Sequence, residues 1–202
     1  HLDDRTAGST CPGNNHFGVK NMIAFNIDGA LSKNSERSLD FLEKEIAEIT
    51  NTENFQGTMA EAMVGADVFI GVSAPKLVSK EMVASMNKGA IVFPMANPES
   101  EIDYQDAIEA GAAVVGTGRS DHPNQINNVL AFPGLFKGAF IAEATKITEN
   151  MKLAAAQAIA EIIPESELTS DYIIPSPFNP DLVDIIIKKV AEAAIKDGVI
   201  RS

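Results

Sequence analysis

The stretch "ADVFIGVSAPKLVSKEMVASMNKGAIVFPM", Ala66 to Met95, decides the fold. Two short apolar runs, 66–72 and 90–95, stand on either side of the helical segment "SKEMVASMN". A third run, "AAVVGT" at 112–117, follows the helical "EIDYQDAIEAG". Short strands that alternate with helices and lack polar alternation are typical of parallel sheets. The pattern predicts an α/β fold, a Rossmann-like open parallel sheet with helices on both faces.

The flanking segments extend this pattern. "VKNMIAF" (19–25) predicts a further strand buried on both faces, and "TMAE" (58–61) has the form of a capping box. The C-terminal third is predicted to be helical, with a last helix that starts at Asn179 and Pro180 and ends near Gly198. Residues 1–17 show no period and are interpreted as an atypical stretch (linker, tag or fragment remnant), whereas residues 18–202 form one predicted domain.

Charge and composition limit the partners. The formal net charge of -12 argues against nucleic acid as the main partner, because the protein would repel a phosphate backbone. No apolar run is long enough to span a bilayer, and the N-terminus lacks the features of a signal peptide. We therefore expect a cytoplasmic protein with no membrane partner. The single cysteine excludes an internal disulfide.

The residues that follow the predicted strands are the candidates for a binding site, because ligands of open α/β sheets lie beyond the carboxyl ends of the strands. They are Asn26 and Asp28, then Ser73, Ala74 and Pro75, then Asn97, and finally the amides of "GTGRSDHPNQINNVLAFPG" (116–134), with Asn127 and Asn128. Each has an ordinary reading as a turn or a strand exit. Their convergence on one edge would suit a carboxamide, ribose hydroxyls and a small polar substrate.

Several common site motifs are missing. No G-x-G-x-x-G follows a predicted strand, and no Walker motif occurs. The histidines His1, His16 and His122 are too scattered to suggest a metal site. The histidines therefore do not predict a metal site.

The strings "GADVFIGVSAP", "MANPESEI", "GTGRSDHPNQINNVLAFPG", "MKLAAAQAIAEIIP" and "DYIIPSPFNP" resemble, in order and spacing, the C-terminal half of bacterial-type malic enzymes. The resemblance covers roughly residues 18–199. It implies a malate dehydrogenase (oxaloacetate-decarboxylating), which oxidises L-malate with NAD or NADP and a divalent metal, Mg or Mn, to pyruvate and carbon dioxide. It also implies a homo-oligomer.

The resemblance assigns roles to the candidate residues. Ser73, Ala74 and Pro75 would lie along the cofactor, and Asn97 would lie near both nicotinamide and malate. Asn127 would contact the cofactor and Asn128 the substrate. Asn26 stands where the family often has an acidic residue, and Asp28 could replace it in part. NAD is favoured over NADP because no basic cluster awaits a 2′-phosphate.

The chain also departs from the family pattern. The glycine-rich phosphate turn and first strand are replaced by "HLDDRTAGSTCPGNNHF". The resemblance places the family's catalytic lysine and tyrosine and its metal ligands on an N-terminal half. It therefore implies no catalytic residue and no metal ligand in this chain, whose contribution would be positioning. The fragment alone is expected to be inactive. Two alternatives stay open: a non-catalytic module that binds a nucleotide or acyl ligand, and a fragment with no independent function.

Overall fold

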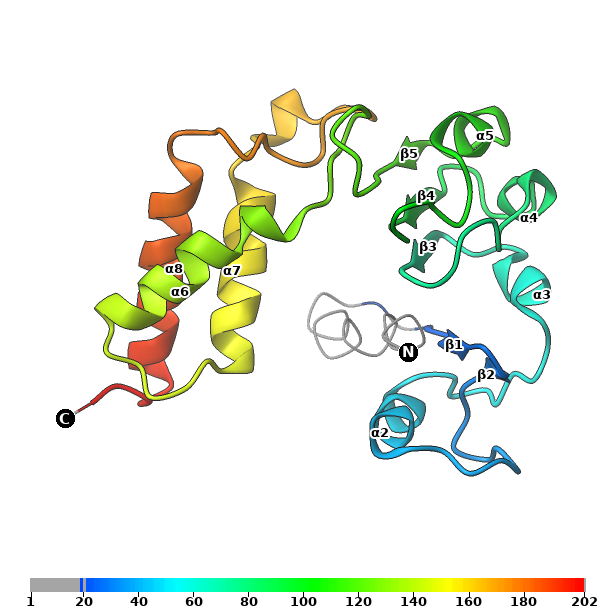
Figure 1. Cartoon of the computed structure of the whole chain (residues 1–202), viewed down its shortest axis with the longest axis horizontal. Coiled ribbons are helices and arrows are strands. Elements are labelled where there is room, and N and C mark those ends of the chain that lie inside the picture. The colour runs from blue at the N-terminus through cyan, green and yellow to red at the C-terminus, as the bar shows by residue number, and fades with distance from the viewer. Residues whose placement is uncertain (1–18, 20, 202) are drawn as a thin grey trace. The chain divides into compact units, whose positions relative to one another are not determined.

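The computed structural model describes Val19 and residues 21–201, so the interpretation of residues 1–17 lies outside the described residues. The chain forms two compact units that divide between His122 and Pro123 (Figure 1). The first unit holds the strands and the second holds three longer helices. Among the described residues, no helix combines the length and apolar character that crossing a bilayer requires.

The first unit contains the predicted parallel sheet. It consists of β3 (Val68–Gly71), β4 (Ile91–Pro94) and β5 (Val114–Val115), which lie in that order. Both strand pairs are parallel, as the alternation of strands and helices predicts. The strands are shorter than the apolar runs, and the first and last residues of each run lie outside the strands.

The helices α3 (Met59–Met63), α4 (Lys80–Ala84) and α5 (Tyr104–Glu109) share one apolar core with this sheet (Figure 1). Val92 and Val115 point into that core and are almost completely buried. The neighbouring strand residues, whose side chains point to the other face, are only half-buried. The predicted capping box of α3 is confirmed, with Thr58 and Glu61 bonding reciprocally.

The strand predicted over 19–25 is wrong. Among the described residues of that range, only Phe25 belongs to a strand, β1 (Phe25–Asn26), which pairs antiparallel with β2 (Gly29–Ala30) rather than joining the parallel sheet. The turn at 27–28 folds the chain back on itself, with Gly29 at φ 120°. This hairpin packs with α2 (Phe41–Ile49) around a small second core, which comprises Ala24, Leu31, Leu39, Ile46 and Ala47.

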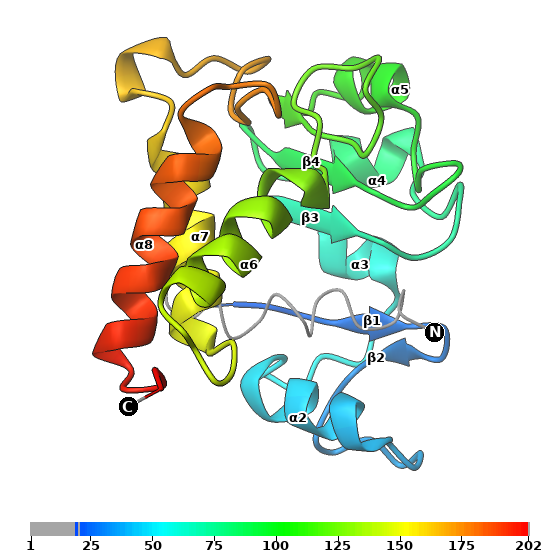
Figure 2. The ribbon, with the colours of Figure 1, turned by 60° about the vertical axis from the view of Figure 1, so that its left-hand side comes forward.

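The second unit is a bundle of three helices, α6 (Phe132–Ile141), α7 (Glu149–Glu161) and α8 (Leu182–Lys196) (Figure 2). Two short 3-10 helices accompany them, η2 (Asn128–Leu130) and η3 (Glu165–Glu167). The bundle core is completed by fully buried side chains of α8, among them Ile186 and Val190. Burial of one such side chain contributes about 1.5–3 kcal/mol.

The predicted start of the last helix needs correction. Helix α8 begins at Leu182 with Asp181 as its N-cap, not at Asn179 and Pro180. The side-chain oxygen of Asn179 instead accepts a hydrogen bond from the Asp181 backbone N–H at 2.9 Å, which makes a turn before the helix. The predicted end is confirmed, since Gly198 adopts φ 66° directly after the C-cap.

Two glycines let α6 approach α8 closely. A Cβ atom at Gly134 would lie 2.6 Å from the Ile186 Cβ, and one at Gly138 would lie 2.8 Å from the Ile187 carbonyl oxygen. The two glycines are four residues apart and so lie on the same face of α6. The contact between these helices therefore requires glycine at both positions.

We predict that Gly138→Ala lowers the free energy of unfolding of this chain by about 1–3 kcal/mol, because the added methyl overpacks the contact with α8. The higher helix propensity of alanine offsets only about 1 kcal/mol of this loss. Chemical denaturation measures the change. Lys137→Ala, on the exposed side of the same helix, serves as the control and should change stability by less than about 0.5 kcal/mol. A Gly138→Ala variant as stable as the wild type would contradict the close-approach account.

Candidate functional site

The ends of β3 and β4 bring two of the predicted site segments to one edge of the sheet. Gly71 pairs with Pro94 in the parallel register, and the Met95 backbone N–H donates to the Gly71 carbonyl at 2.8 Å. Both strands therefore end at the same level. The segment 73–75 leaves β3 beside the segment 96–98 that leaves β4, at the edge where open α/β sheets bind ligands.

One buried carboxyl group joins these two segments. Glu101 is completely inaccessible to solvent. Its Oε1 accepts hydrogen bonds from the Ser73 backbone N–H at 2.7 Å and from the Ser73 hydroxyl at 3.3 Å. Its Oε2 accepts from the Ala96 backbone N–H at 3.1 Å. The backbone at both strand exits is thus held by a single side chain.

Asn97 directly follows Ala96 in the chain and is exposed. Its side chain makes no hydrogen bond to any other residue within the described part of the chain, which leaves both a carbonyl acceptor and an amide donor for a ligand. Ala74 and Pro75 are exposed as well and provide an apolar surface beside it.

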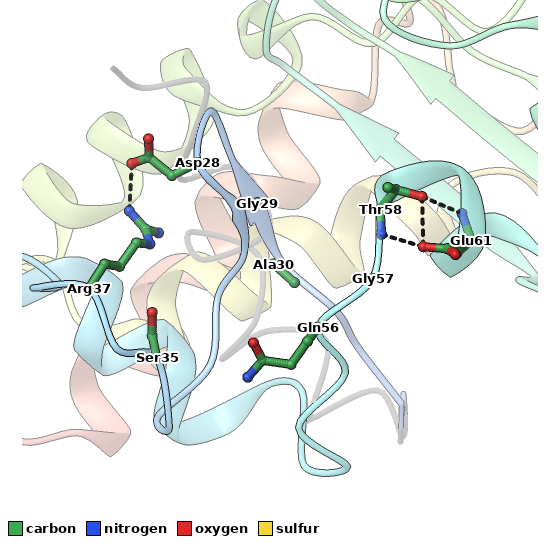
Figure 3. Close-up of a pocket in the computed structure, with 9 residues that line it drawn as sticks. All are labelled: Asp28, Gly29, Ala30, Ser35, Arg37, Gln56, Gly57, Thr58 and Glu61. Carbon is green, nitrogen blue, oxygen red and sulfur yellow. Dashed lines mark hydrogen bonds and ion pairs between the residues drawn. The ribbon is translucent and has the colours of Figure 1, made fainter.

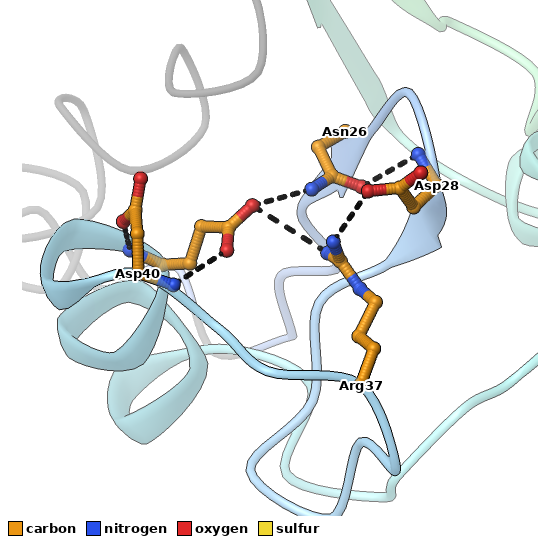
Figure 4. Close-up of polar contacts among 5 residues, drawn as sticks. Asn26, Asp28, Arg37 and Asp40 are labelled. Carbon is orange, nitrogen blue, oxygen red and sulfur yellow. Dashed lines mark hydrogen bonds and ion pairs between the residues drawn. The ribbon is translucent and has the colours of Figure 1, made fainter.

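Asn26 and Asp28 lie in the β1–β2 hairpin, where their side chains are engaged within the protein (Figure 4). The Asn26 amide donates to Glu43 Oε1 at 2.5 Å, and its carbonyl accepts from the Asp28 backbone N–H at 2.9 Å. Asp28 pairs with Arg37 at 2.7 Å. The second Arg37 terminal nitrogen lies 3.6 Å from Glu43 and is buried with no hydrogen bond to the described residues.

A hollow of about 430 Å³ opens beside this hairpin (Figure 3). Polar groups dominate its wall, with Asp28 and Arg37 on one side and the capping box of α3 on the other. In that box the Thr58 backbone N–H donates to Glu61 and lowers the pKa of the Glu61 carboxyl. The hollow thus carries more carboxylates than cations. It is lined by Asp28, Gly29, Ala30, Ser35, Arg37, Gln56, Gly57, Thr58 and Glu61.

The amide-rich loop after β5 contains asparagines that bind the protein's own backbone and asparagines that are exposed to solvent. Asn124 is buried at φ 54°, donates to the Ser170 carbonyl at 2.7 Å and accepts from the Ile173 N–H at 2.8 Å. It therefore fixes the loop to the segment 170–173. Asn127 caps η2, since its side-chain oxygen accepts a hydrogen bond from the Val129 N–H at 3.0 Å. Its side-chain NH₂ group can therefore donate to a ligand. Asn128 is exposed at the first position of η2.

Asn97 belongs to the first unit and Asn127 and Asn128 belong to the second, so their convergence on one ligand stays a prediction. Arg119, at the start of the same loop, is engaged by Asp121 through two hydrogen bonds of 2.8 and 2.6 Å. These bonds hold the pKa of the Asp121 carboxyl at about 2. Arg119 therefore has a carboxylate partner within its own loop.

Metal ligands do not gather in the described part of the chain. Over residues 19 and 21–201, no three side chains of the His, Cys, Asp or Glu type lie together as a metal site would need. The described residues therefore do not form a complete divalent-metal site by themselves.

Comparison with known proteins identifies the family. Residues 19–197 match the family model described as "Malic enzyme, NAD binding domain". The chain belongs to the malic enzyme family. It is 48% identical over 186 residues to the bifunctional malic/malolactic enzyme of Bacillus subtilis, with 92% of this chain and 45% of that protein covered. It is also 48% identical to the NAD-dependent malic enzyme of Geobacillus stearothermophilus, with 91% and 38% covered.

Solved malic enzymes share the fold of this chain. The crystal structure of the Entamoeba histolytica malic enzyme matches 94% of the chain with a TM-score of 0.87 and 40% identity. The Pyrococcus horikoshii malic enzyme matches 96% of it with a TM-score of 0.86 and 39% identity. The chain spans less than half the length of each of these malic enzymes, at 40% and 46%. The predicted Rossmann-like α/β fold is thereby confirmed.

Two residues of this malic enzyme domain were missed by sequence reasoning. Glu101 stands in the quoted "MANPESEI", but its sequence neighbours do not show that the carboxyl is buried. Arg37 lies nine residues after Asp28, in an ordinary polar stretch, and only the folded chain shows that it donates a hydrogen bond to Asp28. Neither residue stands directly after a predicted strand, which was the signal used for the other candidates.

The two kinds of asparagine in the loop after β5 should respond differently to truncation. We predict that Asn124→Ala lowers the free energy of unfolding by about 2–4 kcal/mol, because it leaves two backbone groups without their partner and places alanine at positive φ. Asn128→Ala should change it by less than about 0.5 kcal/mol. Denaturant titration of both variants gives the comparison, and equal losses would contradict the division.

Proposed function

We propose that this chain is the cofactor-binding part of a malic enzyme that oxidises and decarboxylates L-malate to pyruvate and carbon dioxide. The family match over residues 19–197 supports the proposal. The observation that carries it within the molecule is the exposed amide of Asn97, without a protein partner in the described residues, at the carboxyl edge of the parallel sheet. A neutral amide at that edge suits a nicotinamide and a hydroxy acid.

When bound, a nicotinamide dinucleotide supplies the hydride acceptor. The residues of this chain would bind and orient the two reactants. Asn97 would hold the nicotinamide or malate by its amide. The cofactor would lie along Ser73, Ala74 and Pro75. Asn127 would donate a hydrogen bond to the cofactor, and Asn128 would contact malate. Orientation of this kind contributes about 7–11 kcal/mol in favourable intramolecular models.

Proton transfer is proposed to lie outside this chain. Within the described residues no tyrosine directly follows β3, β4 or β5, and Lys76, which follows Pro75, is paired with Glu99 at 3.3 Å. The chain spans 45% of its Bacillus subtilis relative, which leaves room for a second part with the general acid, the general base and the divalent-metal ligands. Self-association and a cytoplasmic location stay predictions from the sequence.

The charges around Arg37 support NAD as the cofactor. Asp28 and Glu43 flank the guanidinium, so one cation faces two carboxylates beside the hollow. A 2′-phosphate would add a further negative charge at that place, whereas a ribose hydroxyl would add none. The relatives include both NAD- and NADP-dependent malic enzymes, and this balance of charges is a feature of the chain itself.

The orienting role of the free amides is tested in the complete enzyme. We expect Asn97→Ala and Asn128→Ala each to lower kcat/KM for malate oxidation by about tenfold or more, because each removes a hydrogen bond to a reactant. Steady-state NADH formation measures this effect. Asn34→Ala, an exposed asparagine of the first unit, is the control and should leave kcat/KM unchanged. Normal turnover in both site variants would refute the assignment.

The same assay distinguishes the proposed enzyme from the alternative, a non-catalytic module that binds a nucleotide. A complete protein that binds NAD but never oxidises malate would support that alternative, while malate-dependent NADH formation would exclude it.

Cofactor choice should respond to the two carboxylates beside Arg37. We predict that Asp28→Asn with Glu43→Gln shifts the ratio of kcat/KM values toward NADP by about tenfold, because the guanidinium becomes available to a 2′-phosphate. Glutamine still suits the third helical position of a capping box, so α2 should keep its N-terminus. Glu45→Gln, exposed on the same helix, is the matched control. An unchanged ratio in the double variant would show that Arg37 does not meet the cofactor.

A further inference from the structure

Glu101 is exceptional among the described residues. It is the only charged side chain there that is fully buried, and glutamate is almost never found in this state unless it is paired. Its partners are two backbone N–H groups and one hydroxyl, rather than a lysine or an arginine. A buried carboxyl group without a cationic partner is costly for stability alone, because an apolar side chain would fill the same space without desolvation of a charge.

The hydrogen bonds of Glu101 are arranged across two separate segments. One oxygen accepts both donors of Ser73, which follows β3, and the other accepts the backbone N–H of Ala96, which follows β4. The distance between the two carboxyl oxygens is fixed by covalent geometry. The side chain therefore acts as a rigid spacer between the two strand exits.

The surrounding structure keeps this spacer in place. Gly71, the last residue of β3, lacks the Cβ atom that would otherwise lie 2.5 Å from the Glu101 Cδ. The main chain that carries Glu101 is bound as well, since the Val78 N–H donates to the Glu101 carbonyl at 3.0 Å and the Lys76 N–H donates to the Ser100 carbonyl at 3.1 Å. Both the carboxyl group and its backbone are thus fixed to the segment that leaves β3.

We propose that Glu101 is a positioning residue, whose buried carboxyl group sets the spacing between Ser73 and Asn97 and so prepares this edge of the sheet for the dinucleotide. The inference rests on the proposed cofactor-binding function. Ala96, whose N–H the carboxyl group holds, directly precedes Asn97, so the direction of the Asn97 amide depends on that hydrogen bond. Glu101 itself is buried beneath the two segments and acts through them.

The test uses the complete enzyme with Glu101→Gln. The amide has nearly the shape of the carboxyl group, but its NH₂ then faces either the Ser73 or the Ala96 backbone N–H, and one of the two segments loses its acceptor. We expect the Kd for NADH, measured by its fluorescence, and the KM for NAD each to rise about tenfold. These values are measured well below the melting temperature, where the variant is folded.

Glu99→Gln is the matched control. Glu99 lies in the same connection between β4 and α5, is exposed and pairs with Lys76 at 3.3 Å, so its variant should bind NADH as the wild type does. A second variant, Gly71→Ala, leaves every hydrogen-bonding group in place but displaces the carboxyl group, and should raise the Kd for NADH in the same direction.

The outcomes separate this inference from the proposed function. A wild-type enzyme that binds no NADH would refute the cofactor site itself. A wild type that binds NADH, with a folded Glu101→Gln variant that binds it equally well, would overturn only the role of Glu101. If both Glu101→Gln and Gly71→Ala fail to fold, Glu101 holds the fold rather than the site, which also overturns the proposal. Weakened NADH binding in folded variants, with unchanged binding in Glu99→Gln, would support it.

Discussion

The parallel pairing of β3 with β4 is the constraint on which the rest of the first unit depends. Because Gly71 and Pro94 lie opposite each other, the two chains leave the sheet at the same level and at the same edge. An antiparallel pair would send them to opposite edges. Every proposal about Ser73, Asn97 and Glu101 follows from this register, and the apolar core beneath the sheet, with Val92 and Val115, holds the register in place.

The chain uses its asparagines in two distinct ways. Asn26, Asn124 and Asn127 have side-chain oxygens committed to backbone N–H groups, and these residues shape a hairpin, a loop and a helix start. Asn97 and Asn128 are exposed, and a ligand can reach them. An abundance of amides in a loop is therefore neither purely structural nor purely functional. The partner of each amide decides its role, and that partner is a property of the fold.

Sequence reasoning predicted the parts of the fold that rest on local periodicity and caps. The apolar runs around Val68, Ile91 and Val114 gave the parallel strands, and Thr58 with Glu61 gave a helix start. It failed at 19–25, where an apolar run was read as a buried strand although the following turn folds it into a hairpin. Apolar character shows that a run seeks burial, but the choice of strand partner depends on contacts far along the chain.

The same limit applies to the site. The rule that ligands lie beyond strand ends selected Ser73 and Asn97, which follow β3 and β4 at the same edge of the sheet. It could not select Glu101 or Arg37, since their roles come from burial and from partners 28 and 9 residues away. A charged residue becomes notable only when its surroundings are known. The family resemblance predicted the fold and the general place of the site, and the structure shows which side chains hold the strand ends together.

The central claim is that a dinucleotide binds at the edge where β3 and β4 end. Hydrogen–deuterium exchange of the complete enzyme, with and without saturating NADH, tests it most directly. The account predicts that NADH slows exchange in peptides covering 72–77 and 95–99, which carry Ser73 and Asn97. Slower exchange elsewhere in the enzyme, with both of these peptides unchanged, would contradict it.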